Sequence, residues 1–154
     1  MKFSILVTTG QDFKNWQDCF KHLAGLLEKE KKVKPGYWDS VLEREKEFPT
    51  GLQVTPTVGI AIPHPSNPKL SLESTIAVSI LPNPIEVCSM AEPDEKIMVS
   101  VVLMLALEGS EDHLIMLQQM METFQDESLL QNLLRIKDTQ VIQKLLEDRL
   151  GASN

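Results

Sequence analysis

The stretch Gly59-Ile60-Ala61-Ile62-Pro63-His64-Pro65 decides how this chain is interpreted. Its apolar first half, with two β-branched isoleucines, predicts a short buried strand. Pro63 has no N–H to donate to a sheet ladder, so we expect the strand to end there. His64 would then lie at the strand end, on backbone that a proline stiffens on each side. An imidazole in this place can act as base, ligand or nucleophile, although a histidine that merely ends a strand in a solvated turn fits the same pattern.

Length and composition describe an ordinary globular chain. It has 154 residues, of which 42% are hydrophobic and 24% are charged, which favours one domain with a single sizeable core. The 15 Lys and Arg against 22 Asp and Glu give a net charge of −7. This balance disfavours nucleic acid or an anionic membrane as the main partner. We therefore expect a single domain over residues 1–154 that binds no nucleic acid.

The apolar stretches of the sequence do not resemble a signal peptide or a membrane span. The apolar N-terminal stretch at residues 1–7 is too short for a signal peptide, and no apolar run approaches the roughly 20 residues that span a bilayer. The two cysteines, Cys19 and Cys88, lack metal-type spacing and are expected to be reduced thiols. These features predict a cytoplasmic protein without direct membrane insertion.

Hydrophobic periodicity predicts strands mixed with helices. The expected elements are a strand or disordered lead at 3–8, a helix from Asp12 to Lys32, a helix at 37–47, a loop or strand at 52–57, strands at 59–62 and 74–81, a turn at 82–84, short and long strands at 85–87 and 98–107, and helices capped by Ser110, Asp126 and Asp138. The nearly all-apolar segment 98–107 favours a central strand buried on both faces over a buried helix. The predicted fold class is α/β, a single domain with a mixed β-sheet flanked by helices on both faces.

Three titratable residues could converge on one site. His64 is the first, and His113 is the second, in the first turn of the helix that Ser110 opens. The positive end of a helix dipole favours a neutral imidazole there. Arg44 is the third, between two glutamates on the second predicted helix. The alternative interpretation makes His113 a surface residue and Arg44 part of a solvated helix face with weak ion pairs. His22 is given no role.

The sequence lacks the common motifs for hydrolysis, metal binding and nucleotide binding. The chain has no Gly-x-Ser-x-Gly for a hydrolase, and no His-Glu-x-x-His or Cys-x-x-Cys for a metal. It also has no Gly-x-x-x-x-Gly-Lys phosphate loop for a nucleotide. We therefore expect no cofactor and no metal.

Several of these segments, taken in order, resemble one family. The segments are Glu43-Arg44-Glu45-Lys46, Pro49-Thr50-Gly51, Gly59 to His64, Glu111-Asp112-His113-Leu114 with the Leu- and Met-rich helix after it, and the final Thr139 to Leu146. They are similar to the IIA component (EIIA) of the bacterial sugar phosphotransferase system (PTS), in its mannitol/fructose/galactitol type, type 2. The resemblance covers roughly residues 12–148.

The resemblance implies a phosphotransferase in which His64 accepts a phosphoryl group from phospho-HPr and donates it to a cysteine of a IIB component. Arg44 and His113 match the family residues that hold the phosphoryl oxygens and orient the active imidazole. The family fold is a mixed sheet between helix layers. Pro65 departs from the pattern, because many members carry a small residue there. The stretch 48–52 and the freestanding chain lean toward the galactitol-like subgroup.

A second hypothesis keeps the same phosphorylatable fold but makes it a regulatory module that signals to a transcription factor or transporter. A pure interaction domain with an inactive site is disfavoured, because all three expected residues are present. A phosphocarrier serving two protein partners is expected to have a shallow site with an apolar rim.

Overall fold

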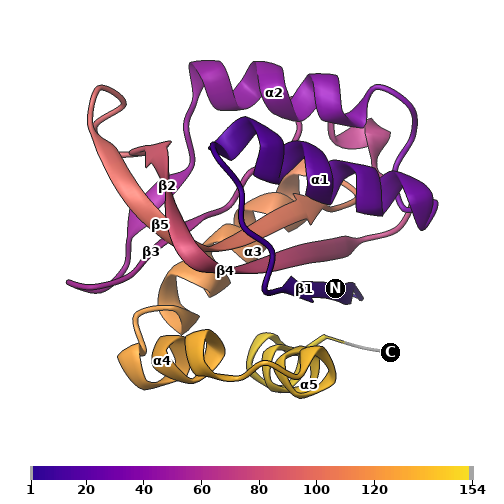
Figure 1. Ribbon diagram of the computed structural model, residues 1–154. Coiled ribbons are helices and arrows are strands. Elements are labelled where there is room, and N and C mark those ends of the chain that lie inside the picture. Colours follow the sequence, from indigo (N-terminus) through magenta and orange to yellow (C-terminus); the bar gives the residue numbers. More distant parts are fainter. Residues whose placement is uncertain (1, 153–154) are drawn as a thin grey trace.

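The computed structural model describes residues 2–152. Its elements are β1 (Ser4–Thr9), α1 (Trp16–Lys29), α2 (Tyr37–Glu47), β2 (Gly51–Gln53), β3 (Gly59–Ala61), a short 3₁₀-helix (Pro68–Leu70), β4 (Thr75–Cys88), β5 (Lys96–Ala106), α3 (Ser110–Thr123), α4 (Glu127–Arg135) and α5 (Thr139–Leu150). Figure 1 shows α1 and α2 on one side of the strands and α4 and α5 on the other.

The five strands form one mixed sheet in the order β1-β4-β5-β3-β2. β1 is parallel to β4 and β3 is parallel to β5, whereas β4 and β5, and β2 and β3, are antiparallel. β5 is the central strand, and its second half is fully buried. The prediction of a central strand buried on both faces is thereby confirmed, and the alternative of a buried helix is wrong.

Successive residues of β5 point into two separate cores. Val101, Leu103 and Leu105 belong to one apolar cluster, together with residues of α3, α4 and α5. The intervening Val102 and Met104 belong to a second cluster, with residues of α1 and α2. Because strand side chains alternate between faces, an unbroken apolar strand requires helices on both faces of its sheet. The predicted α/β class with helices on both faces is confirmed.

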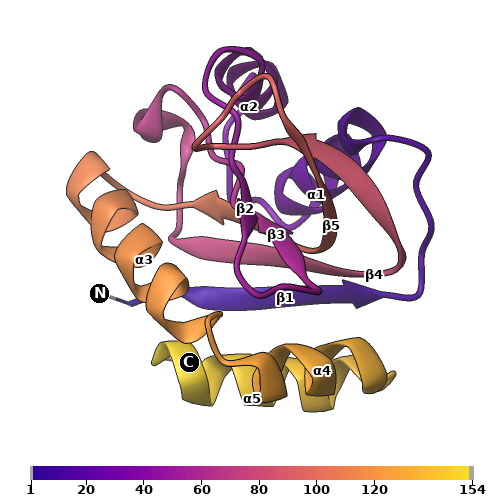
Figure 2. The same ribbon diagram turned by 90° about the vertical axis from the view of Figure 1, so that its left-hand side faces the viewer.

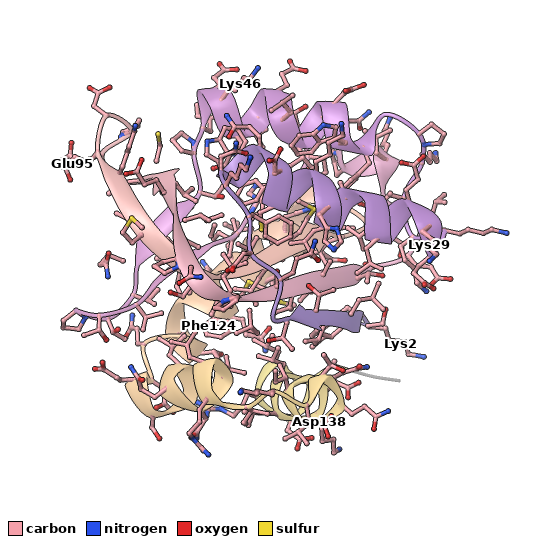
Figure 3. The ribbon with its side chains drawn as sticks, viewed as in Figure 1. Lys2, Lys29, Lys46, Glu95, Phe124 and Asp138 are labelled. Atoms are coloured by element: carbon pink, nitrogen blue, oxygen red, sulfur yellow. The ribbon has the colours of Figure 1, made fainter. Side chains whose placement is uncertain are left out.

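Figure 2 shows α3 running along the edge of the molecule beside the strands and reaching down to the layer formed by α4 and α5. Figure 3 shows Phe124, which directly follows α3, between the sheet and that layer, while Lys46 and Asp138 lie on opposite outer surfaces. Phe124 is fully buried. One end of α3 is therefore fixed in the core, and its other end is left near the strand termini.

The predicted turn at 82–84 is wrong. β4 stays extended from Thr75 to Cys88, but its pairing with β5 slips, so that Ile80 pairs with Val101 and Ile85 pairs with Val99. The two prolines of this segment cannot donate ladder hydrogen bonds, and the segment is exposed where it leaves the ladder. The prolines therefore bulge the strand without reversing it.

Two helices start differently from the sequence prediction. The first helix begins at Trp16 rather than near Asp12, because the Asn15 side chain accepts the N–H of Asp18 and caps it. Gly109, not Ser110, is the N-cap residue of α3. Its φ of 112° is a conformation that side chains disfavour, so the chain can turn there only because the residue is glycine.

The remaining boundaries agree closely with the sequence. The segment predicted at 3–8 is a strand, β1, shifted by one residue, and residues 51–53 form the short strand β2. α2 has the predicted bounds, and Asp126 and Asp138 cap α4 and α5 as expected. Each of the two aspartates accepts a backbone N–H from the first turn of its helix.

The close contact between β3 and β5 predicts an effect on stability. A Cβ added at Gly59 would overlap the carbonyl oxygen of Met98, whereas a Cβ added at Gly25 would meet nothing within 4 Å. We expect Gly59→Ala to lower the free energy of unfolding by about 1–3 kcal/mol through overpacking. Gly25→Ala, in the exposed middle of α1, is the matched control and is expected to raise it by about 0.5–1 kcal/mol. Urea unfolding of both variants checks this, and equal effects would contradict it.

Candidate functional site

β3 delivers His64 to a buried position. After Ala61 the chain stays tied to the sheet, because the Ile62 N–H donates to the Thr50 carbonyl (N···O 3.3 Å) and the Pro63 carbonyl accepts the Leu105 N–H (2.9 Å). Only 7% of His64 is exposed. The interpretation of His64 as a strand-ending histidine in a solvated turn is therefore wrong.

One hydrogen bond sets the protonation of the His64 ring. Nδ1 lies 2.9 Å from the Ile62 carbonyl oxygen. A carbonyl can only accept, so Nδ1 carries the ring proton, and Nε2 of the neutral imidazole carries the lone pair. The nitrogen that can act as a nucleophile is therefore Nε2.

His113 is held in the same way from the neighbouring strand. β5 leads into Gly109, whose carbonyl accepts both the His113 backbone N–H (3.3 Å) and its Nδ1–H (2.9 Å). His113 is 7% exposed, so its interpretation as a surface residue is wrong. Its buried Nε2 has no hydrogen-bond partner among the residues that the structure describes.

The parallel pairing of β3 with β5 brings the two histidines together. Adjacent parallel strands end at the same edge of a sheet, so the segments that follow them become neighbours. The ring centroids of His64 and His113 lie 5.4 Å apart, with the ring planes tilted by 39°. Within residues 2–152, no hydrogen bond joins the two rings, and each is oriented by a backbone carbonyl instead.

Arg44 reaches this place from α2. Its Nη1 donates to the Phe48 carbonyl (3.1 Å), and its guanidinium carbon lies 5.5 Å from the centre of the Phe48 ring. Arg44 makes no ion pair with a described carboxylate, so the predicted weak ion pairs on a solvated face are not found. Several of its N–H groups stay available to an anion.

Glu45 is the residue that sequence reasoning missed. It is 4% exposed, and its two carboxylate oxygens accept the N–H (2.8 Å) and the hydroxyl (2.7 Å) of Thr50. Burial raises the pKa of Glu45 to about 7, although Thr50 and Arg44 act against the rise. This contact closes the turn that contains Phe48 and so fixes the carbonyl that holds Arg44. The sequence gives no signal of this burial, because Glu45 lies within the charged run at 43–47, where a buried glutamate cannot be told from a solvated one.

A hollow of about 250 Å³ unites all three predicted residues. Its lining consists of Arg44, His64, Pro65, Ser66, Pro68, Ser110, His113, Leu114 and Leu117. Two large apolar side chains near these residues in the sequence are exposed: Phe48, four residues after Arg44, is 57% exposed, and Leu114, next to His113, is 58% exposed. The site thus combines a small polar floor with apolar side chains at its margin.

The charges in the hollow favour an incoming anion. Burial lowers the pKa of His64 to about 4, and Arg44 and His113 add to this, while the bond to Ile62 opposes it. Burial also lowers the pKa of His113; Arg44 adds to the lowering, and the bond to Gly109 and the nearby Asp112 oppose it. Both rings are therefore neutral at neutral pH, beside one fixed positive charge on Arg44. A neutral imidazole that lines one hollow with a guanidinium is suited to receive a phosphoryl group.

Other reactive residues lie elsewhere. His22 is an exposed residue of α1, with its ring centroid 5.4 Å from that of Phe13. Cys19 and Cys88 are free cysteines, and burial raises the pKa of Cys19 to about 12. No group of three or more potential metal ligands occurs among residues 2–152. In the same range, no helix has the length and apolarity needed to cross a bilayer.

The family model for the phosphoenolpyruvate-dependent sugar phosphotransferase system, EIIA 2, matches residues 3–149. The chain therefore belongs to the type-2 EIIA family, and its general role is that of a phosphotransfer protein of this system. No curated protein sequence was found to match it.

Solved structures with the same fold agree with this assignment. The crystal structure of IIA mannitol from Escherichia coli has a TM-score of 0.76 and 21% identity, covering 91% of this chain and 94% of that chain. The same TM-score, with 20% identity and coverage of 94% and 93%, relates the chain to a complex of enzyme IIA mannitol and phosphorylated enzyme IIB mannitol from Escherichia coli. The nitrogen regulatory protein IIA-Ntr from Neisseria meningitidis has a TM-score of 0.64 and 18% identity, with coverage of 92% and 91%.

The buried environment of His64 predicts its titration. Its pKa lies at about 4 in the folded chain, against an ordinary value of 6.5, so between these pH values the unfolded chain binds a proton that the folded chain does not. We expect the His64 ring to stay neutral at pH 5.5 in NMR titrations of its Cε1–H shift. The stability that the neutral ring contributes is full above pH 6.5 and is lost as the pH falls toward 4.

The control is His64→Ala, whose free energy of unfolding is expected to fall less than that of the wild type over the same pH range. A titration midpoint near 6.5 in the wild type would contradict the buried, neutral nucleophile.

Proposed function

We propose that this chain is a phosphocarrier that accepts a phosphoryl group from phospho-HPr on His64 and passes it to a cysteine of a IIB component for sugar or polyol uptake. The observation that carries the proposal is the arrangement of the hollow. A buried, neutral His64, whose Nε2 carries the lone pair, lines the same small hollow as Arg44 and His113. Membership of the type-2 EIIA family supports the same conclusion.

The transfer needs positioning more than covalent assistance. The Nε2 lone pair of His64 attacks phosphorus, and the Nε2–P bond forms as the bond to the donor nitrogen breaks, with its electron pair staying on the donor. Nδ1 keeps its proton, because the Ile62 carbonyl holds it. In the second step a thiolate of the IIB component attacks phosphorus, and the P–N pair returns to Nε2.

Arg44 and His113 are proposed to hold the phosphoryl oxygens. The guanidinium offers several N–H donors in a plane, which suits two oxygens of one phosphoryl group. His113 is already anchored through Nδ1, so only Nε2 can serve the hollow. A neutral Nε2 accepts rather than donates, and the arriving negative charge favours its protonation. His113 therefore becomes a donor when the phosphoryl group is in place.

The apolar rim is proposed as the shared docking surface for HPr and IIB. Both partners have to bring one atom to His64, and exposed Phe48 and Leu114 provide contact area around a shallow site. The similar IIA mannitol structure is a complex with phosphorylated IIB mannitol. For this chain we propose a IIB of a galactitol-like or related polyol system, and a cytoplasmic location.

A regulatory module is the second candidate. The similarity to a nitrogen regulatory IIA protein favours it. Both functions use phosphorylation of His64, so the acceptor separates them. Rapid transfer from phospho-His64 to a IIB cysteine supports the carrier, and a stable phospho-form that no IIB discharges supports the regulator.

His64 is expected to be the only phosphorylated residue. The chain is incubated with phosphoenolpyruvate, Enzyme I and HPr, and an acid-labile phosphate is mapped by mass spectrometry. His64→Ala is expected to abolish labelling, because it removes the nitrogen that we propose as the nucleophile. His22→Ala is the control and keeps full labelling. Undiminished labelling of His64→Ala would refute the proposal.

The supporting residues are expected to slow transfer without unfolding the chain. Arg44→Lys keeps the charge but loses the planar fork, and His113→Ala removes the Nε2 group. Each is expected to reduce the transfer rate by about 10²–10³, the usual effect of removing a preorganised donor. Rapid-quench kinetics from phospho-HPr measure this, with Lys46→Ala on the outer face of α2 as the control. Wild-type rates in both variants would mean that these residues have no part in transfer.

A further inference from the structure

We propose that the hydroxyl of Ser66 donates a further hydrogen bond to the phosphoryl group on His64; this inference rests on the proposed function. Ser66 lies two residues beyond the nucleophile and lines the same hollow as Arg44 and His113. It forms and breaks no covalent bond in the transfer. Its part is to offer a fixed O–H to a phosphoryl oxygen.

A hydrogen-bond network fixes the position of Ser66. Its Oγ lies 2.9 Å from the Oγ of Ser40 on α2, and its backbone N–H donates to the Ser40 carbonyl (3.4 Å). The next residue, Asn67, donates its backbone N–H to the Ser40 Oγ (3.1 Å). Ser40 therefore clamps the segment after His64 to the helix that also carries Arg44.

The direction of the hydroxyl bond follows from burial. Ser40 is 8% exposed, and its Oγ already accepts the Asn67 N–H. The Ser66 Oγ is the acceptor that the described contacts offer to the Ser40 proton. A buried hydroxyl that left its proton unpaired would lose free energy, so Ser40 donates and Ser66 accepts. The proton of the exposed Ser66 hydroxyl is then left for another acceptor.

The phosphoryl oxygens require hydrogen-bond donors, and the Ser66 hydroxyl can supply one. Three oxygens arrive in a hollow whose fixed positive charge is that of Arg44, and His113 can donate only after it gains a proton. A hydroxyl needs no change of protonation to donate. The Ser40 clamp also holds Ser66 in place before the group arrives, which lowers the cost of organising the site.

Ser110 provides a matched comparison. It is also an exposed serine that lines the hollow, but its hydroxyl has no hydrogen-bond partner within residues 2–152 that would fix it. The hollow is thus lined by one serine whose hydroxyl is fixed by a hydrogen bond, Ser66, and by one whose hydroxyl is not, Ser110. The proposal assigns the contact to Ser66 and not to Ser110.

The test is the equilibrium of phosphoryl exchange between phospho-HPr and the full chain, followed by ³¹P NMR. Ser66→Ala is expected to shift it toward phospho-HPr by about tenfold, the factor for losing a hydrogen bond to a charged group. Ser110→Ala is expected to leave it within twofold. The nearly isosteric pair Ser66→Thr and Ser66→Val separates the hydroxyl from packing: threonine keeps the wild-type equilibrium, and valine matches alanine.

Each outcome decides the question. Equal equilibria for the threonine and valine variants, or an unshifted alanine variant, would overturn the role of Ser66 while leaving phosphorylation of His64 standing. A wild-type chain that takes no phosphoryl group from phospho-HPr would overturn the proposed function, and this inference with it.

Discussion

The site depends on two hydrogen bonds from imidazole Nδ1 to backbone carbonyls. The Ile62 carbonyl holds His64, and the Gly109 carbonyl holds His113, each at 2.9 Å. Because a carbonyl accepts only, both rings have a fixed tautomer in which Nε2 carries the lone pair. Burial then keeps both rings neutral by lowering their pKa values. A nucleophile that needs no separate base follows from these constraints.

The sheet makes this arrangement possible by bringing distant segments to one edge. β3 and β5 are parallel neighbours, so His64 and the start of α3 emerge side by side. α2 is fixed above them, because the buried Tyr37 hydroxyl donates to the Leu105 carbonyl (2.7 Å). Through Ser40 the same helix holds the segment after His64, and through Arg44 it supplies the positive charge. The packing of α2 on the sheet therefore determines both where Arg44 lies and where the segment after His64 is held.

Most of the fold could be predicted from the sequence, because local patterns carry it. Apolar residues in 98–107 required a strand covered on both faces, and Asp126 and Asp138 marked helix starts. The failures have local causes as well. The prolines of 82–84 indicated a turn, but a bulge also accommodates missing N–H donors. Ser110 is a good N-cap residue by type, yet Gly109 takes the position because the backbone there has positive φ.

The convergence of three residues on one place could be predicted from the sequence, but their contacts could not. His64, His113 and Arg44 do line one hollow, as the motifs suggested. Their separate patterns were also compatible with solvated surface residues, and only the tertiary structure buries the two rings. The Glu45–Thr50 and Ser40–Ser66 contacts join residues across turns, and no periodicity predicts them. Such contacts depend on how α2 lies on the sheet, which a single sequence does not specify.

The central claim is that His64 acts through Nε2 while Nδ1 stays bound to the Ile62 carbonyl. Long-range ¹H–¹⁵N spectra of the ¹⁵N-labelled chain, recorded before and after phosphorylation by phospho-HPr, test it most directly. The account predicts a neutral Nδ1–H tautomer of His64 in the free chain and a ³¹P coupling to Nε2 of the same ring afterwards. A phosphoryl group on Nδ1 of His64, or on another residue, would contradict it.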